Sequence, residues 1–211
     1  MKIGFIGSGN IGTALAKIWI NSGHEVMLSF TRHPEELKQK ARDMGALSGT
    51  PEEAVTFGDV VVLAVMYKIL DKALEQAGSL DGKIIIDTNN SLIPPDHTEF
   101  AVTGHDSVAE QIARKAKGAK VVKAFNTVGA NILASNSRDF NGDTPVMFYC
   151  GNDRDAKEKV VPLIKDAGFE PVDIGKLQSA RYIEPMVGLW RSLVASDDIS
   201  GEFAFSLVRR R

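Results

Sequence analysis

The chain has a single cysteine, Cys150, among 211 residues, which excludes an internal disulfide bond. This usage is typical of a reducing cytoplasm, and Cys150 falls in a predicted strand, where a buried structural thiol is expected. No apolar run reaches the roughly 18 residues that a membrane span requires. Because the first predicted strand follows Met1 directly, the sequence also predicts no signal peptide. We therefore expect a cytoplasmic protein without a membrane partner.

The chain also has no large excess of charge of one sign. Lys and Arg number 25 and Asp and Glu number 27, so the formal net charge is −2. This balance gives no general attraction to nucleic acid or to an anionic membrane. The four histidines lack the spacing of metal ligands, and no metal site is predicted. His24 is interpreted as structural, His33 could assist a phosphate, and no role is assigned to His97, His105 or the loop 89–106 that carries them.

The residue pairs that serve several classes of reductase are missing as well. A carbonyl reductase usually needs a proton donor, but Asp71, Asp153 and Met186 stand four residues after the three tyrosines, so no Tyr-x-x-x-Lys pair occurs. No large second helical domain bearing an acid or a lysine follows. Both absences weigh against the chemistry of 2-hydroxy acids, imines and pyrrolines, and no catalytic side chain is assigned.

The stretch that organises the chain is present at its start, where residues 1–13 read MKIGFIGSGNIGT. An apolar run suited to a buried parallel strand leads into Gly7, Gly9 and Gly12, and an amphipathic helix pattern follows at once. In this setting G-x-G-x-x-G predicts a dinucleotide-binding turn. Gly7 allows the tight turn, Gly9 lets the backbone approach a pyrophosphate, and Gly12 lets helix and strand pack closely. The helix N-terminus then offers N–H groups and a positive dipole to the phosphates.

Strand and helix patterns then alternate along the chain. The alternation predicts an α/β protein with a Rossmann-type, doubly wound, mainly parallel sheet in a single domain over residues 1–211. Residues 126–144 are interpreted as a loop or a short helix. Strands are expected at 3–6, 25–30, 46–47, 60–65, 83–88, 120–125, 146–150 and 170–174, and helices from 11 and from 51 and at 34–44, 69–77, 107–117, 153–167 and 177–195.

The C-terminal helical segment, from about 177, predicts how the molecule assembles. Arg181 and Glu184 lie three residues apart and are most simply a surface pair, although a site role stays open. Met186 and Trp190 share a helix face that is interpreted as a core or dimer contact. With the tail 203–207, this helix carries more apolar side chains than one sheet face covers, which predicts a homodimer.

The second strand predicts which dinucleotide binds. NAD enzymes of this fold carry Asp or Glu near the end of that strand, where the carboxylate binds the ribose hydroxyls. Here the window reads Leu28-Ser29-Phe30-Thr31-Arg32-His33 and contains no acid. Ser29, Thr31 and Arg32 supply two hydroxyls and a cation, which suit a phosphate monoester. We therefore expect NADP(H), although Arg32 could also be an ordinary surface arginine beside two turn residues.

Three stretches together carry a resemblance: GFIGSGNIGTALA at 4–16, VVKAFNTVGA at 121–130 and DAGFEPVDIGKLQSARYIEPMVGLW at 166–190. The chain resembles the NADPH-dependent oxidoreductases related to archaeal NADP:deazaflavin (coenzyme F-420) oxidoreductase. It is also similar to the cytoplasmic reductase domain of the STEAP metalloreductases. The first stretch is shared by many Rossmann proteins, whereas the second and third are more specific.

The resemblance implies NADP lying across the carboxyl ends of the strands. Archaeal deazaflavin enzymes have a His-Thr pair where this chain has Asn126-Thr127, so the deazaflavin is one of several acceptors that stay open. By resemblance, Ser8, Gly9, Asn10 and Ile11 form the phosphate turn, Ser29 and Arg32 with Thr31 contact the 2′-phosphate, Val65-Met66-Tyr67 border the nicotinamide, and Asn126 and Thr127 lie beside it where the second cofactor stacks.

The residues themselves predict an acceptor site at the same edge. Met66-Tyr67, Asn89-Asn90 and Phe125-Asn126-Thr127 each follow a predicted strand, so they should meet in the crevice of the fold. They combine apolar or aromatic surface with amide and hydroxyl groups and include no charge, as stacking and hydrogen bonding of a flavin-like ring require. Alternatively, Asn89 and Asn126 only cap the ends of their strands.

Together these patterns predict an NADPH-dependent oxidoreductase that transfers hydride between NADP(H) and a small redox acceptor: FMN, FAD or a deazaflavin. Such a transfer needs no protein nucleophile, because the cofactors carry the chemistry and the protein holds two rings together. Two alternatives remain: an NADP(H)-binding sensor or partner protein without turnover, and a reductase of small carbonyl compounds. The physiological acceptor and the direction of transfer stay open.

Overall fold

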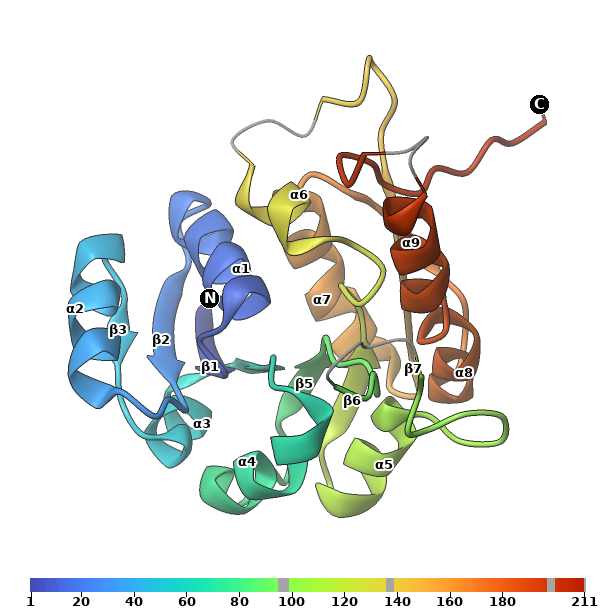
Figure 1. The fold of residues 1–211 in the computed structure, drawn as a ribbon. Helices are drawn as coiled ribbons and strands as arrows, with labels where there is room; N and C mark the ends of the chain where they lie inside the picture. Colours follow the sequence, from blue (N-terminus) through green and yellow to red (C-terminus); the bar gives the residue numbers. More distant parts are fainter. Residues whose placement is uncertain (95–98, 136–138, 197–199, 211) are drawn as a thin grey trace.

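The computed structural model describes residues 1–94, 99–135, 139–196 and 200–210; His97 and Arg211 lie outside them. Within these residues, eight strands form one sheet in the order β3-β2-β1-β4-β5-β6-β7-β8 (Figure 1). The strands are β1 (Lys2–Ile6), β2 (Glu25–Ser29), β3 (Leu47–Ser48), β4 (Val60–Leu63), β5 (Ile84–Asp87), β6 (Lys120–Lys123), β7 (Val146–Gly151) and β8 (Glu170–Asp173).

Helices connect the strands and cover both faces of the sheet (Figure 1). The predicted Rossmann-type class is confirmed, and the late strands extend the same sheet as expected. The helices are α1 (Asn10–Asn21), α2 (Pro34–Met44), α3 (Pro51–Phe57), α4 (Leu70–Ala77), α5 (Val108–Lys115), α6 (Ala130–Ala134), α7 (Arg154–Asp166), α8 (Ala180–Ile183) and α9 (Met186–Ala195), with 3₁₀ helices η1 (Tyr67–Ile69) and η2 (Leu177–Ser179).

The carboxyl ends of the central strands align at one edge of the sheet. All neighbouring strands are parallel except β6 and β7, which are antiparallel. At this edge Ile6 is opposite Leu63, Leu63 is opposite Asp87, and Asp87 is opposite Lys123. The chain order reverses between β1 and β4, which is where open α/β sheets bind ligands.

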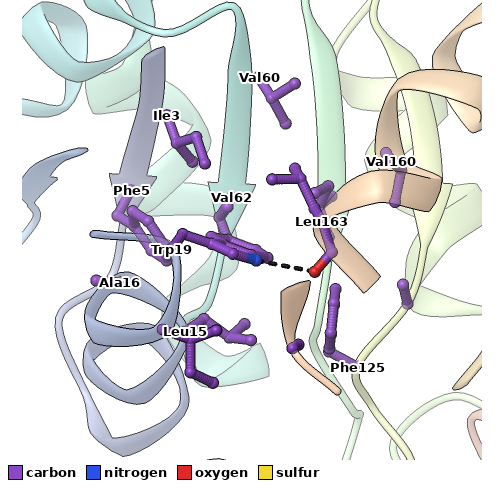
Figure 2. Packing of buried hydrophobic residues seen from close by; sticks show 14 of the residues in the cluster. Ile3, Phe5, Leu15, Ala16, Trp19, Val60, Val62, Phe125, Val160 and Leu163 are labelled. Atoms are coloured by element: carbon purple, nitrogen blue, oxygen red, sulfur yellow. Dashed lines mark hydrogen bonds between the residues drawn. The ribbon is translucent and has the colours of Figure 1, made fainter. Parts of the chain in front are cut away.

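Alternating side chains of the strands build a core on each face. In β4, Val60 and Val62 pack with α1, α2 and α7 on one face, while Val61 and Leu63 pack with α4, α5 and α8 on the other. This alternation is the period of two that a strand imposes. Trp19 of α1 is fully buried in the first core, and its Nε1 donates to the Leu163 carbonyl oxygen at 2.9 Å, which joins α1 to α7 (Figure 2).

The prediction of a single long helix over residues 177–195 is wrong. The structure has η2, then α8, then α9, and the chain breaks at Glu184-Pro185. Proline has no N–H and its ring clashes with the preceding turn, so it stands at the N-cap of α9 and not inside a helix. The strands predicted to reach 65, 88 and 125 also end earlier, at Leu63, Asp87 and Lys123. Among the described helices, none has the length and apolarity to span a bilayer.

Candidate functional site

The glycine turn between β1 and α1 leaves room for a ligand at one position only. Gly7 has a φ of +114°, and a Cβ there would lie 2.1 Å from the carbonyl oxygen of Ala64. At Gly12, a Cβ would lie 2.3 Å from the carbonyl oxygen of Gly7, because α1 packs directly on the turn. At Gly9, a Cβ would meet no described heavy atom within 4 Å. The backbone thus shows the tight turn at Gly7 and the close packing at Gly12, and open space lies beside Gly9.

The start of α1 has free hydrogen-bond donors. Gly9 is its N-cap residue, no side chain of the described residues caps the helix, and no acidic residue lies in the first turn. By contrast, α3, α5 and α7 begin at Thr50, Ser107 and Asp153, and each of these side chains accepts a backbone N–H. Free N–H groups and the positive end of a helix dipole favour a phosphate.

Lys40 is a cation beside this turn that our sequence interpretation missed. From α2, its Nζ donates to the carbonyl oxygen of Ser8 at 3.2 Å. Lys40 also lines a cavity of about 600 Å³ with Asn10, Thr13 and other residues of α1 and α6. A signal for it existed, because Lys40 stands three residues after the buried Leu37 and therefore on the sheet side of the helix.

Of the three residues at the end of β2 that were predicted to contact a 2′-phosphate, only Thr31 and Arg32 are exposed. Ser29 is fully buried, and its Oγ donates to the carbonyl oxygen of Phe5 at 2.6 Å, so the geometry does not support a role for Ser29 in binding. Phe30 has a φ of +61°, which is rare for a bulky residue. Thr31 and Arg32 are exposed, and within the described part of the chain no ion pair is found for Arg32.

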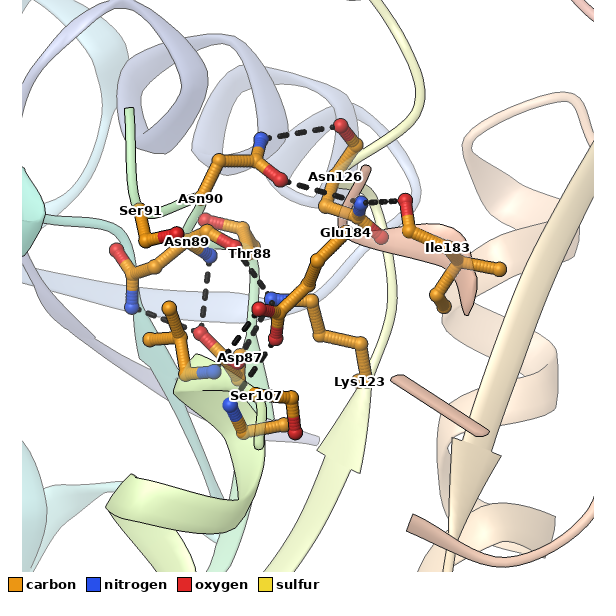
Figure 3. A network of polar contacts seen from close by, with 12 residues as sticks. Asp87, Thr88, Asn89, Asn90, Ser91, Ser107, Lys123, Asn126, Ile183 and Glu184 are labelled. Atoms are coloured by element: carbon orange, nitrogen blue, oxygen red, sulfur yellow. Dashed lines mark hydrogen bonds and ion pairs between the residues drawn. The ribbon is translucent and has the colours of Figure 1, made fainter. Parts of the chain in front are cut away.

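A buried ion network lies at the carboxyl ends of β5 and β6 (Figure 3). Lys123 and Asp87 are fully buried and Glu184 is 3% exposed. The Nζ of Lys123 lies 2.8 Å from Asp87 Oδ2 and 3.1 Å from Glu184 Oε1, and it also donates to the carbonyl oxygen of Asn89. One ammonium is therefore shared by two carboxylates directly beside the loop that follows β5.

The charges of this network are tightly coupled. Burial by itself would lower the pKa of Lys123, but the negative charges of Asp87 and Glu184 outweigh it and raise that pKa above the ordinary 10.5. Lys123 therefore stays protonated at neutral pH. Burial raises the pKa of Glu184, while the charge of Lys123 and two backbone N–H groups act in the opposite direction.

The network holds the loops of the site in place. Glu184 accepts the N–H groups of Val108 at 2.9 Å and Ala109 at 3.1 Å, so its carboxylate caps the start of α5. Asn89 donates its Nδ2 to Asp87 at 2.8 Å and accepts the N–H of Val65 at 2.9 Å. The Asn89 side chain is thus used within the fold, which matches the structural alternative for this residue.

The prediction that Arg181 and Glu184 pair with each other at the surface is wrong. Arg181 binds Glu110 in bidentate fashion, with Nε–Oε2 and Nη2–Oε1 distances of 2.7 and 2.6 Å, while Glu184 is buried against Lys123. Burial would raise the pKa of Glu110, but the hydrogen bonds from Arg181 and Ser107 lower it below its usual value. Helical spacing predicted the pair, but the spacing does not show which other element covers the helix face.

Asn126 lies at a second cavity, of about 370 Å³. It follows Phe125, which has a φ of +63° and bends the chain after β6. The Asn126 Nδ2 donates to the carbonyl oxygen of Ile183 at 2.7 Å and to Asn90 Oδ1 at 3.2 Å (Figure 3). The cavity is lined by Ile11, Thr88, Asn90, Phe125, Asn126, Thr127, Val128, Gly129, Ala130, Asn131, Val187 and Trp190.

The predicted segments meet, but they offer different amounts of surface. Hydrogen bonds join Val65 to Asn89 and Asn90 to Asn126. Met66 is 52% exposed, whereas the hydroxyl of Tyr67 donates to Gln111 Oε1 at 3.0 Å. Asn126, which is 3% exposed, is thus more enclosed than Met66 in the loop after β4. Thr127 is 4% exposed and lines that cavity.

A doubly wound sheet with an uncapped glycine turn defines a dinucleotide-binding protein of the Rossmann class. A sequence model described as NADP oxidoreductase, coenzyme F420-dependent, matches residues 2–91. The crystal structure of a putative F420-dependent NADP reductase from Arthrobacter sp. FB24 is 30% identical, with a TM-score of 0.87, and the match covers 99% of this chain and 100% of that one. The chain belongs to this family, and it is an NADP-dependent oxidoreductase.

Two further comparisons extend this result. Metalloreductase STEAP3 of Rattus norvegicus is 32% identical over 183 residues, which are 87% of this chain and 36% of the relative. The chain therefore spans only about a third of that protein's length. An imine reductase from Aspergillus terreus, with a TM-score of 0.64 and 19% identity over 95% of this chain and 67% of that one, shares the fold alone.

Proposed function

We propose that this protein transfers hydride between NADP(H) and a flavin or deazaflavin acceptor. One observation carries the proposal: Ile11 belongs to the first turn of α1, beside the phosphate turn, and also lines the cavity at Asn126. A dinucleotide with its pyrophosphate on α1 therefore has a partly apolar cavity next to it for the nicotinamide and a second ring. The likeness to the Arthrobacter protein, a putative F420-dependent NADP reductase, supports the same class of acceptor.

Different residues of the chain suit the pyrophosphate and the 2′-phosphate of NADP(H). The free N–H groups of α1 and the open space beside Gly9 suit the pyrophosphate. Arg32 and Thr31 suit the 2′-phosphate, since residues 29–33 include no carboxylate. When bound, NADPH supplies a hydride, that is, a proton with two electrons, from its nicotinamide ring.

The chain itself needs only to hold and shield the reacting rings. Phe125, Val187 and Trp190 give the cavity apolar walls, and Asn126 and Thr127 give it polar groups. The buried Lys123 lies behind the loop, where it fixes Asn89 and does not enter the cavity lining. No side chain has to form a covalent bond or to exchange a proton for hydride to pass between two bound cofactors.

The cofactor part of the proposal is tested by binding. We expect NADPH to bind more tightly than NADH, and Arg32→Ala to weaken NADPH by about 1.5–3 kcal/mol, because a hydrogen bond to a charged group is lost. NADH affinity should hardly change. Calorimetry measures both, with Arg42→Ala, another exposed arginine near α2, as the control that leaves both affinities unchanged. Equal wild-type affinities for the two cofactors would contradict the proposal.

The acceptor part is tested by turnover. NADPH oxidation is followed with FMN, FAD and a deazaflavin for the wild type and for Asn126→Leu, which roughly keeps the volume and removes the polar group. We expect flavin reduction, measured at saturating NADPH, to fall at least about tenfold, or about 1.4 kcal/mol in the barrier. Binding of NADPH without turnover of any acceptor would favour a sensor, and turnover with a carbonyl panel would favour a small-carbonyl reductase.

We also infer a homodimer formed through α9. No residue of α9 is buried, and Leu189 and Val194 are 51% and 37% exposed. Part of the predicted tail surface is already covered within the chain, because Phe203 stacks on Trp190 with ring centroids 5.9 Å apart. Light scattering at micromolar protein tests the inference, and a monomer mass would overturn it. A cytoplasmic location stays a prediction that rests on the single cysteine.

A further inference from the structure

Two residues that line the cavity at Asn126 each carry a buried polar side-chain atom that has no hydrogen-bond partner among the described residues. Among the described residues, the unpartnered buried side-chain atoms are Asn126 Oδ1, Trp190 Nε1 and Asp106 Oδ1. Asn126 and Trp190 both line the same cavity, while Asp106 lies elsewhere, beside Arg114. Native structures leave few such atoms, and a cluster of two in one cavity calls for an explanation.

The free atom of Asn126 is the oxygen and not the nitrogen. Its Nδ2 is surrounded by two acceptors, the carbonyl oxygen of Ile183 at 2.7 Å and Asn90 Oδ1 at 3.2 Å (Figure 3). Asn90 is fixed in turn, because its own Nδ2 donates to the carbonyl oxygen of Asn126 at 3.2 Å. A flipped Asn126 amide would place oxygen against oxygen at both contacts. Asn126 therefore presents an acceptor, on a residue that is 3% exposed.

The free atom of Trp190 is a donor, because an indole N–H can only donate. The ring is held on two sides. A Cβ at Gly129 would lie 2.7 Å from Trp190 Cζ2, so the indole packs on the bare backbone of that glycine. Phe203 stacks on the indole with an interplanar angle of 24°. The donor is thus part of a packed arrangement at the cavity wall.

We propose that Asn126 and Trp190 form a two-point recognition site for an amide-type edge, a carbonyl next to an N–H. Asn126 Oδ1 accepts from the N–H of the ligand, and Trp190 Nε1 donates to its carbonyl oxygen. The proposal deepens the proposed function and rests on it for the two molecules that could carry this edge. One is the carboxamide of the nicotinamide, and the other is the lactam or imide edge of a flavin-like acceptor.

The first experiment removes the N–H from each source in turn. Lumiflavin and 3-methyllumiflavin are titrated into the NADP⁺-bound protein by flavin fluorescence, and NADP⁺ and its 3-acetylpyridine analogue are titrated by calorimetry. We expect one analogue to bind the wild type at least about tenfold more weakly than its parent, which identifies the source. The affinity of that analogue for the Asn126→Leu variant should be no lower than its affinity for the wild type. The variant lacks the acceptor oxygen that the analogue leaves unpaired in the wild type. These are binding measurements, so they decide the question even where no flavin is turned over.

The second experiment tests the donor. Trp190→Phe keeps an aromatic ring on Phe203 and removes the N–H, and we expect it to weaken the identified parent ligand at least about fivefold. Phe203→Leu, which loosens the packing and keeps the N–H, is the matched control and should change that affinity less than twofold. Near-ultraviolet circular dichroism checks that each variant is folded. The proposal is overturned if both N–H-free analogues bind the wild type as tightly as their parents, a result that needs no variant.

Discussion

Replacing Lys123 by Met tests the central claim that one buried ammonium holds the site together. The substitution keeps a side chain of similar length and removes the only cation that the described residues place against Asp87 and Glu184. Three acceptors then each lose one donor: the two carboxylates and the carbonyl oxygen of Asn89. Water cannot replace the donor without entering the core, since Lys123 and Asp87 are 0% exposed.

The magnitude follows from this burial. Breaking a fully buried ion pair by removing one partner costs about 3–5 kcal/mol, because a buried charge is left uncompensated. A domain of this kind has roughly 5–15 kcal/mol of stability in total, so the variant should lose a large part of it and remain measurable. Adding Glu184→Gln to Lys123→Met removes one of the stranded charges. We expect the double variant to lose about 1–3 kcal/mol less than the sum of the two single losses.

The assay is urea unfolding, followed by circular dichroism. Lys120→Met is the matched control, because Lys120 lies on the same strand and pairs with Asp153 at 3.0 Å, but these side chains are 40% and 33% exposed. Such a surface pair contributes about 0–1 kcal/mol. If Lys123→Met costs no more than Lys120→Met, or if the effects of Lys123→Met and Glu184→Gln are additive, the reasoning about the network is refuted.

Three further outcomes are expected. The stabilisation by Lys123, measured as the difference in unfolding free energy from Lys123→Met, should still be fully present as the pH rises from neutral toward 10.5, and should shrink as the pH rises through the raised pKa of the folded state. The thiol of Cys150 should not react with a thiol reagent at neutral pH, because burial raises its pKa to about 12. Gly9→Ala should fold and bind NADPH at least about tenfold more weakly, whereas Gly12→Ala should lose stability, since its Cβ would lie 2.3 Å from a carbonyl oxygen.

Each of these three predictions would be contradicted by a specific result. A stability difference that already falls between about pH 7 and pH 9 would mean that Lys123 titrates below its ordinary value. Labelling of Cys150 in the native protein, at a rate close to that in urea, would show an accessible thiolate. Equal stability of the Gly9→Ala and Gly12→Ala variants in the same urea titration would contradict the close packing of α1 on the turn.

The sequence alone determined the order of the strands and the place of the glycine turn. Gly7, Gly9 and Gly12 stand between an apolar run and an amphipathic run, and local backbone geometry follows from such a pattern. The capping side chains of Thr50 and Ser107 likewise act within their own turns, so helix starts could be predicted from neighbouring residues.

Tertiary structure decided which polar side chains are buried and what they bind. Ser29 was expected at a phosphate and instead donates to Phe5, because a side chain at the end of a strand can point to either face. Glu184 was expected at the surface with Arg181 and instead meets Lys123, which is far earlier in the chain and comes near only when β6 and α8 pack. Asp87 at the end of an apolar strand and Lys123 at the end of the next strand were the signal for such a network, but their partners depend on contacts between distant elements. The unpaired atoms of Asn126 and Trp190 could be found only in three dimensions, since a missing partner has no pattern along a chain.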